Sequence, residues 1–312
     1  MQNEEWERIY IEEIKRNFFN SGKSADKPIA YITGGQSGSG KGGIKKDVFN
    51  QDTRKFVLID IDELRSYHPD HVRLQQSNDR DAASHTHSDA KAWSKQLLSD
   101  AIAAKKNIFL DQTSKNPDNL KNLVARLKQN GYEVDIRLMA VPFEVSKERV
   151  EKRYLNEKEQ DGYGRDCNID LQKQSYHGVG ESYHFLKKHI ANTSTGKNLL
   201  VDRLSIYGEN GDKLAEINAN QAIEQSKLDQ MDSLFVRKRL GDEAARKILS
   251  QVFLNTSLQD LPDLPEKYPA LKEATAYIQS ALSDTAKQQA NQSHYGGAYQ
   301  ARASFRQYLQ AV

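Results

Sequence analysis

Short apolar runs and longer amphipathic stretches alternate along the first two thirds of the chain. The short runs have the length and composition of buried strands, and the stretches between them repeat apolar residues at helical spacing. The predicted strands are Ile29–Thr33, Phe56–Ile61, Asn107–Leu110 and Glu133–Val141. The predicted helices are residues 42–50, a helix ending in Trp93–Ala104, and residues 118–130 and 144–158. This rhythm predicts an α/β fold with a doubly wound, mainly parallel sheet that binds ligands at the carboxyl ends of its strands.

Further elements flank this core. The segments Leu199–Tyr207 and Lys213–Ile217 surround an Asn210-Gly211 turn and predict a last strand pair. Residues 4–19 have amphipathic helical spacing, and a polar linker follows them. Helical patterns recur at Ile223–Leu240, Asp242–Leu254, residues 270–282 and Tyr299–Leu309. We therefore expect an N-terminal helix and linker over residues 1–27, a core over 28–217 and an accessory helical region over 218–312.

Charge and cysteine content narrow the class of protein. Of the 312 residues, 45 are Lys or Arg and 43 are Asp or Glu, which is too balanced for a main partner that is nucleic acid or an anionic membrane. The single cysteine, Cys167, forms no internal disulfide and fits a reducing compartment. No apolar stretch reaches the about 18 residues of a membrane span, and the charged first residues are not those of a signal peptide. We expect a soluble, cytoplasmic protein.

The most specific motif is G-x-x-x-x-G-K, which follows the first strand as Gly35-Gln36-Ser37-Gly38-Ser39-Gly40-Lys41. A strand, a glycine loop and a helix form the context of a phosphate-binding (Walker A) loop, whose backbone N–H groups and lysine hold nucleotide phosphates. The bare pattern arises by chance in roughly one chain in ten of this length, so its context carries the prediction. Gly42 stands where a Ser or Thr hydroxyl usually holds Mg²⁺.

Carboxylates follow two of the predicted strands. Asp60 and Asp62 end the second strand, and two-residue alternation predicts that both point to one side. One acid could accept a proton from an acceptor hydroxyl while its neighbour holds Mg²⁺, or both could be solvated acids that cap the next helix. Asp111 and Thr113 end the next strand and offer an acid and a hydroxyl at the same rim, or a helix cap.

Three arginines are candidates for neutralising a transferring phosphate. Arg149 and Arg153 lie four apart on one predicted helix, and Arg165 follows in a glycine-containing loop. Such side chains can close over a phosphate from a lid, although composition alone favours a solvated face. The histidines at 68, 71, 85 and 87 have spacings that resemble metal sites only faintly and are interpreted as polar surface, and Cys167 as a packed thiol.

These motifs, in this order, resemble the zeta-toxin family of P-loop kinases, the toxins of bacterial toxin–antitoxin pairs. Gly34–Lys41 is similar to the family's G-G-Q-P-G-S-G-K, and Ile59–Asp62 followed by His68-Pro69 is similar to its I-D-x-D…H-P. Asn107–Thr113 is similar to a strand that ends in acid-G-T. The resemblance runs from about Ile29 to Ile217. It implies phosphorylation of the 3′-hydroxyl of the sugar in UDP-N-acetylglucosamine.

The resemblance also implies roles for individual residues. Asp62 is implied as the base, Asp111 and Thr113 as contacts to the acceptor, and Arg153 and Arg165 as cations near the transferring phosphate. Lys41 and the loop would hold ATP or GTP. Mg²⁺ would be held by nucleotide oxygens, water and Asp60, since Gly42 has no hydroxyl.

Departures from the family pattern leave alternatives open. Gln112 replaces a glycine, and Lys115 stands where a substrate contact is usually arginine. The acceptor could therefore be NAD or another nucleotide-like molecule. Gly42 leaves open a nucleotide binder with little catalysis. A toxin-like chain also predicts a restraining partner, either an antitoxin or a chaperone-like protein.

Overall fold

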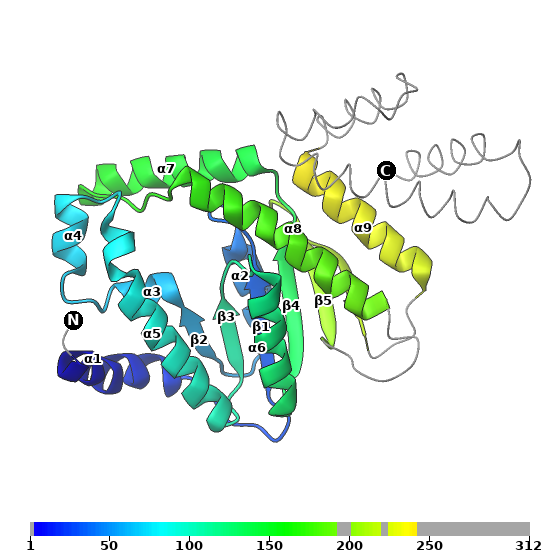
Figure 1. Cartoon of the computed structure of the whole chain (residues 1–312), viewed down its shortest axis with the longest axis horizontal. Coiled ribbons are helices and arrows are strands. Elements are labelled where there is room, and N and C mark those ends of the chain that lie inside the picture. Colours follow the sequence, from blue (N-terminus) through cyan, green and yellow to red (C-terminus); the bar gives the residue numbers. More distant parts are fainter. Residues whose placement is uncertain (1–2, 192–200, 220–223, 242–312) are drawn as a thin grey trace, which may run out of the picture. The chain divides into compact units, whose positions relative to one another are not determined.

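The sheet of the described residues contains six strands in the order β2-β3-β1-β4-β5-β6. The structure is a computed structural model, and it describes residues 3–191, 201–219 and 224–241 (Figure 1). The strands are β1 (Ile29–Gly34), β2 (Val57–Asp60), β3 (Ile108–Asp111), β4 (Glu133–Met139), β5 (Arg203–Tyr207) and β6 (Lys213–Asn218). The pairs from β2 to β5 are parallel, and β6 runs antiparallel to β5. The predicted doubly wound, mainly parallel α/β sheet is confirmed.

Helices connect the strands and follow the sheet. They are α1 (Asn3–Ile9), the π-helix η1 (Tyr10–Phe19), α2 (Lys41–Gln51), α3 (Ile61–Arg65), α4 (His71–Ser77), α5 (Ala82–Ala103), α6 (Pro117–Gln129), α7 (Phe143–Asp161), α8 (Ile169–Ala191) and α9 (Gln225–Leu240). The predicted N-terminal helix is thus α-helical and then π-helical. Its apolar residues Ile9, Ile14 and Phe19 are five apart, which matches the i→i+5 bonding of a π-helix.

Alternation along the strands divides the core between the two faces of the sheet. On β4, Val134, Ile136 and Leu138 pack with α5, α6 and α8 in the larger cluster. Met139 packs on the other face with Ile44 and Val48 of α2. Helices therefore cover both faces, with α2 behind the sheet in Figure 1 and α5, α6 and α8 in front of it.

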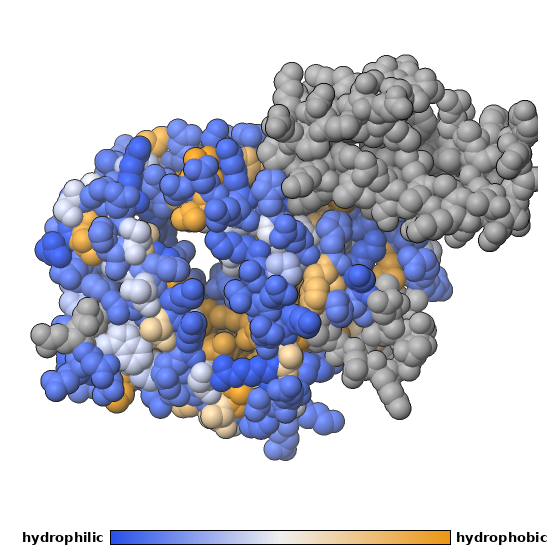
Figure 2. Space-filling model, viewed as in Figure 1, coloured by the Kyte–Doolittle hydropathy of each residue, from blue (hydrophilic) through white to orange (hydrophobic). Residues whose placement is uncertain are grey.

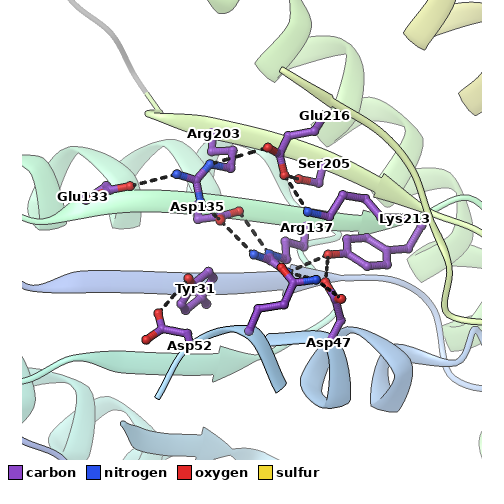
Figure 3. Close-up of polar contacts among 12 residues, drawn as sticks. Tyr31, Asp47, Asp52, Glu133, Asp135, Arg137, Arg203, Ser205, Lys213 and Glu216 are labelled. Carbon is purple, nitrogen blue, oxygen red and sulfur yellow. Dashed lines mark hydrogen bonds and ion pairs between the residues drawn. The ribbon is translucent and has the colours of Figure 1, made fainter. Parts of the chain in front are cut away.

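A network of charged side chains shares the α2 face with the smaller cluster (Figure 3). Arg137 is 3% exposed and donates to Asp47 of α2 at 2.9 Å and to the Tyr207 hydroxyl oxygen at 2.6 Å. Asp135 is fully buried between Arg137 and Arg203, which lie 3.2 Å and 3.0 Å away. Burial raises the pKa of Asp135 while both arginines oppose that rise. The network ties α2, which begins at the glycine loop, to β4 and β5.

Some of the sequence predictions need correction, and others fall outside the described residues. We did not predict α8, although Tyr176, Val179, Tyr183, Leu186 and Ile190 repeat at three- and four-residue spacing; two glycines interrupt that pattern. Strand β2 ends at Asp60, so the alternation argument that paired Asp60 with Asp62 was wrong. The helices predicted at 242–254, 270–282 and 299–309 lie outside the described residues, as do residues 199 and 200 of the predicted strand. The division at residues 27 and 217 stays a prediction.

Candidate active site

The glycine loop lies between β1 and α2, as its context predicted. Gly38 and Gly40 have φ angles of 78° and 92°, which L side chains rarely adopt. A Cβ atom on Gly38 would also overlap the Ser146 carbonyl oxygen of α7. The glycines therefore serve both the turn and the close approach of α7 to the loop.

Both helices that follow β4 hold this loop. The Gln36 side chain is buried, and its Nε2 donates to the Val141 carbonyl and lies 3.2 Å from Ser146 Oγ. The buried Gln172 of α8 donates to the Ser37 carbonyl at 2.9 Å. Sequence reasoning missed Ser146 and Gln172, and no motif marks either of them. Movement of α7 or α8 would therefore act directly on the loop.

Lys41 begins α2, and its Nζ donates to the Gly35 carbonyl at 3.2 Å. The ammonium thus folds back over the loop toward which the N–H groups of the first helical turn point. Ser39 Oγ is buried and has no hydrogen bond to another described residue. A Cβ atom on Gly42 would meet nothing within 4 Å, so no steric reason requires glycine there.

Two carboxylates face each other on neighbouring strands. Asp60 pairs in register with Asp111, and Asp111 Oδ1 accepts from the Thr33 hydroxyl at 2.9 Å. Burial, together with the negative charges of Asp111 and Asp62, raises the pKa of Asp60 to about 6. Asp60 also caps α3 by accepting from the Asp62 backbone N–H at 2.9 Å. Asp62 lies in the first turn of α3 with a side chain that is 66% exposed.

The loop after β3 is fixed by β1, the glycine loop and α8. The Thr113 carbonyl accepts from Gly35 N–H at 3.0 Å. Ser114 has a φ of 51°, donates to the Thr33 carbonyl, and accepts from Ser182 of α8 at 2.6 Å. Lys115 follows it and is exposed. Helix α8 therefore determines where Thr113 and Lys115 lie relative to the glycine loop.

The three candidate arginines have different surroundings. Arg149 donates to the Glu209 carbonyl at 2.9 Å, in the turn between β5 and β6. Glu157 engages Arg165 through Nε at 2.9 Å, through Nη2 and through the backbone N–H at 2.7 Å. Arg153 makes only a long contact, 3.4 Å, to the Arg165 carbonyl, and its buried Nε has no hydrogen bond among the described residues. Arg153 is thus the least engaged of the three.

Asp79, in the loop before α5, holds the segment that carries Arg165. It accepts from Gly164 N–H at 3.2 Å, Lys158 Nζ at 3.3 Å and the Tyr154 hydroxyl at 3.3 Å. Hydrogen bonding lowers the pKa of Asp79 against the effect of burial. Figure 2 shows the molecule hollowed between α3 and α5 on one side and α7 and α8 on the other. The candidate site lies around this hollow.

The other candidate groups do not assemble into a second site. Among the described residues, no three His, Cys, Asp or Glu side chains come together as a metal site. His68 instead pairs with Asp89 at 3.3 Å. Cys167 is half-buried and lies 3.7 Å from the Asn168 carbonyl oxygen.

A glycine loop between β1 and α2 of this sheet defines the class as P-loop proteins of the kinase-like type. The family model described as Zeta toxin matches residues 14–212, and the chain belongs to this family. The family resemblance expected from the motifs is therefore confirmed.

Individual relatives match over part of their length. Toxin PezT of Streptococcus pneumoniae serotype 4 is 33% identical over 131 residues, which cover 42% of this chain and 52% of that protein. Toxin zeta of Enterococcus hirae is 26% identical over 120 residues, which cover 38% of this chain and 42% of that protein. The matched region thus spans about half the length of these curated relatives.

Solved structures share the fold. The structure of the PezAT chromosomal toxin–antitoxin system of Streptococcus pneumoniae has a TM-score of 0.62 at 23% identity, covering 82% of this chain and 99% of that chain. The AvrRxo1-ORF1:-ORF2 complex with ATP has a TM-score of 0.51 at 14% identity, covering 73% of this chain and 70% of that chain. No helix among the described residues is long and apolar enough to cross a bilayer.

Proposed function

We propose that the protein is a kinase that transfers the terminal phosphoryl group of ATP or GTP to a hydroxyl of a nucleotide-activated sugar, such as UDP-N-acetylglucosamine. The observation that carries the proposal is the common edge of the sheet that bears the glycine loop with Lys41, the carboxylates of Asp60 and Asp111, and α3 with Asp62. A phosphoryl transferase needs a phosphate cradle and an acid for the acceptor proton at the same edge.

In this proposal, Asp62 accepts the proton of the acceptor hydroxyl, whose oxygen forms the new bond to the γ-phosphorus. The bond from that phosphorus to the β–γ bridging oxygen breaks, and the nucleoside diphosphate leaves. Lys41 and the loop N–H groups hold the β/γ-phosphates. Arg153 and Arg165 neutralise the charge of the transferring group. Acceptor contacts come from Asp111, Thr113 and Lys115.

The residues present fit a divalent cation without a hydroxyl at Gly42. Asp60 and Asp111 are paired carboxylates, and the pKa of Asp60 is raised first by burial and then by the negative charges of Asp111 and Asp62, which a bound cation would offset. Asp60 would hold Mg²⁺ together with nucleotide oxygens and water. Bound Mg²⁺ would offset charge on the phosphates during transfer.

The relatives support a nucleotide and a protein partner. The toxin and complex names of the similar proteins favour an antitoxin partner for this chain, and the AvrRxo1-ORF1:-ORF2 structure with ATP favours a nucleotide donor. We include a chaperone-like protein as an alternative partner. NAD and other nucleotide-like acceptors stay in the test because Gln112 and Lys115 depart from the family pattern.

The test incubates the protein with ATP or GTP, Mg²⁺ and a panel containing UDP-N-acetylglucosamine and NAD, and detects added phosphate by mass spectrometry. We expect a product from the nucleotide-activated sugar, and no product from Asp62→Asn, whose nucleotide affinity should stay near wild type. Lys41→Ala should weaken nucleotide binding and slow transfer together. Nucleotide binding without any phosphorylated product would favour a binding protein instead of a kinase.

A further inference from the structure

Asp62 is held in place by one side chain. Its own side chain is 66% exposed, and its only ion pair in the described part of the chain is with Arg65, whose Nε lies 3.2 Å from Oδ1. An exposed carboxylate with a single contact samples several rotamers when that contact is lost. The position of the Asp62 carboxylate therefore depends on how well Arg65 is fixed.

Arg65 is fixed by α5. Its side chain is 16% exposed, and Nη1 donates to the Ala83 carbonyl at 2.6 Å. Nη2 lies 3.1 Å from His87 Nδ1. The guanidinium is a rigid plane, so its contacts to Ala83 and His87 fix where its positive charge lies beside Asp62, with which Nε forms an ion pair and no hydrogen bond. Residues on two turns of α5 thus determine where the Arg65 guanidinium lies beside Asp62 of α3.

The electrostatic effects of Asp62 on other residues indicate which charged groups lie near its side chain. Hydrogen bonding to Glu157 raises the pKa of Arg165, and the negative charges of Asp62 and Asp60 also raise it. Burial lowers the pKa of His87, as do the positive charges of Arg65, Lys91 and Lys115, while Asp62 opposes them. Asp62 therefore lies among groups from β2, α5, the loop after β3 and the segment after α7. Helices α3, which carries Asp62, and α5 border the hollow seen in Figure 2, with the elements labelled in Figure 1.

We propose that Arg65 is a positioning residue that fixes the carboxylate of Asp62, and that His87 and Ala83 fix Arg65. The proposal rests on the proposed function, in which Asp62 accepts the acceptor proton. Arg65 lies beside Oδ1 as an ion-pair partner without a hydrogen bond, so the carboxylate is held near one position while its oxygens stay available to the acceptor hydroxyl. His87 accepts from Arg65 only when the ring is neutral with its proton on Nε2, and a lowered His87 pKa favours the neutral ring.

Two pairs of variants test this arrangement. His87→Asn keeps an acceptor near the Nδ1 position, and His87→Leu removes it. Arg65→Lys keeps the charge but cannot contact Asp62, Ala83 and His87 at once. The matched control is His85→Leu, an exposed histidine on the same helix. Thermal midpoints and ATP affinity of each variant report whether the fold and the glycine loop are intact.

We expect His87→Leu and Arg65→Lys to lower kcat about tenfold with KM for ATP unchanged, because misplacing a base slows the chemical step. His87→Asn should restore kcat to within about twofold of wild type, and His85→Leu should equal wild type. If Arg65→Lys and His87→Leu keep the wild-type kcat, the positioning role is overturned but the base assignment is not. The same holds if His87→Asn and His87→Leu lose kcat equally. Wild-type turnover by Asp62→Asn overturns the base assignment and the positioning role together.

Discussion

Gly43, in the first turn of α2, lies against Gly211 in the turn between β5 and β6: a Cβ atom on Gly43 would come 2.7 Å from the Gly211 Cα atom. Gly211 has a φ of 77°, a conformation that favours glycine, so the turn and the start of α2 are both built from residues without a side chain at this contact. The same turn accepts the hydrogen bond from Arg149. The hairpin therefore restrains the start of the helix that carries Lys41.

This contact predicts opposite effects for two adjacent glycines. Gly43→Ala should lower the free energy of unfolding by about 1–3 kcal/mol, because the new methyl group overlaps Gly211. Gly42→Ala is the matched control and should raise it by up to about 1 kcal/mol, since alanine favours a helix and nothing lies nearby. Urea unfolding of both variants measures the difference. Equal changes in the free energy of unfolding for both variants would show that the Gly211 turn moves to make room for the new methyl group.

Gly42→Ser tests how a divalent cation is held. The space around Gly42 accepts a side chain, and a hydroxyl there would add a ligand for Mg²⁺. We expect a lower Mg²⁺ concentration for half-maximal rate, measured by titration at saturating nucleotide. A higher requirement would indicate that the glycine is an adaptation to another mode of metal binding.

Asp60→Asn should change how stability depends on pH. The pKa of Asp60 is raised from 3.8 to about 6, so the folded state holds its proton more tightly and loses stability as the pH rises from about 4 to 6. An amide has no charge to desolvate and can still cap α3. The variant should gain up to about 3 kcal/mol above pH 6 and little below pH 4. Chemical unfolding without metal or nucleotide measures this, and a variant less stable than wild type at pH 7.5 would contradict it.

Arg153→Ala and Arg165→Ala should separate catalysis from stability. Arg153 is assigned to the transferring phosphate, so its loss should lower kcat by about 10²–10³-fold. Because its hydrogen bonding within the described residues is one long bond, the thermal midpoint should stay near wild type. Arg165→Ala should lower both, because it also removes the contacts to Glu157. Glu157→Gln, which leaves Arg165 present, is the control for those contacts. A thermal midpoint that falls further in Arg153→Ala than in Arg165→Ala would refute the assignment.

Arg137→Met should destabilise the protein by about 3–5 kcal/mol, because among the described residues it leaves the fully buried Asp135 with Arg203 as its one charged partner. Replacing Asp135 by leucine in the same chain removes the uncompensated charge and should recover part of the loss. Chemical unfolding of the single and double variants measures both effects. A double variant no more stable than the single one would mean that the ion pair itself, rather than an unpaired charge, dominates.

Much of the site was predictable because its signals are local. The glycine loop needs a strand before it and a helix after it, and both are visible as short apolar and amphipathic runs. Asp60 and Asp111 follow strands, so parallel pairing was enough to expect them at one edge. By contrast, Gln172 and Ser182 contact segments far away in the sequence, and no local pattern marks an amide or a hydroxyl for that purpose.

The sequence by itself determined the alternation of strands and helices, the glycine loop at residues 35–41 and the family, because each is encoded within a few neighbouring residues. Asp62 lies on a helix because Asp60 caps it locally and the strand ends one residue early, a signal that the prediction missed. Tertiary structure alone decided that Arg65 pairs with α5, that Arg165 pairs with Glu157, and that Gly43 but not Gly42 must lack a side chain. These features depend on which residues come into contact when the chain packs, and a local stretch of sequence does not contain that information.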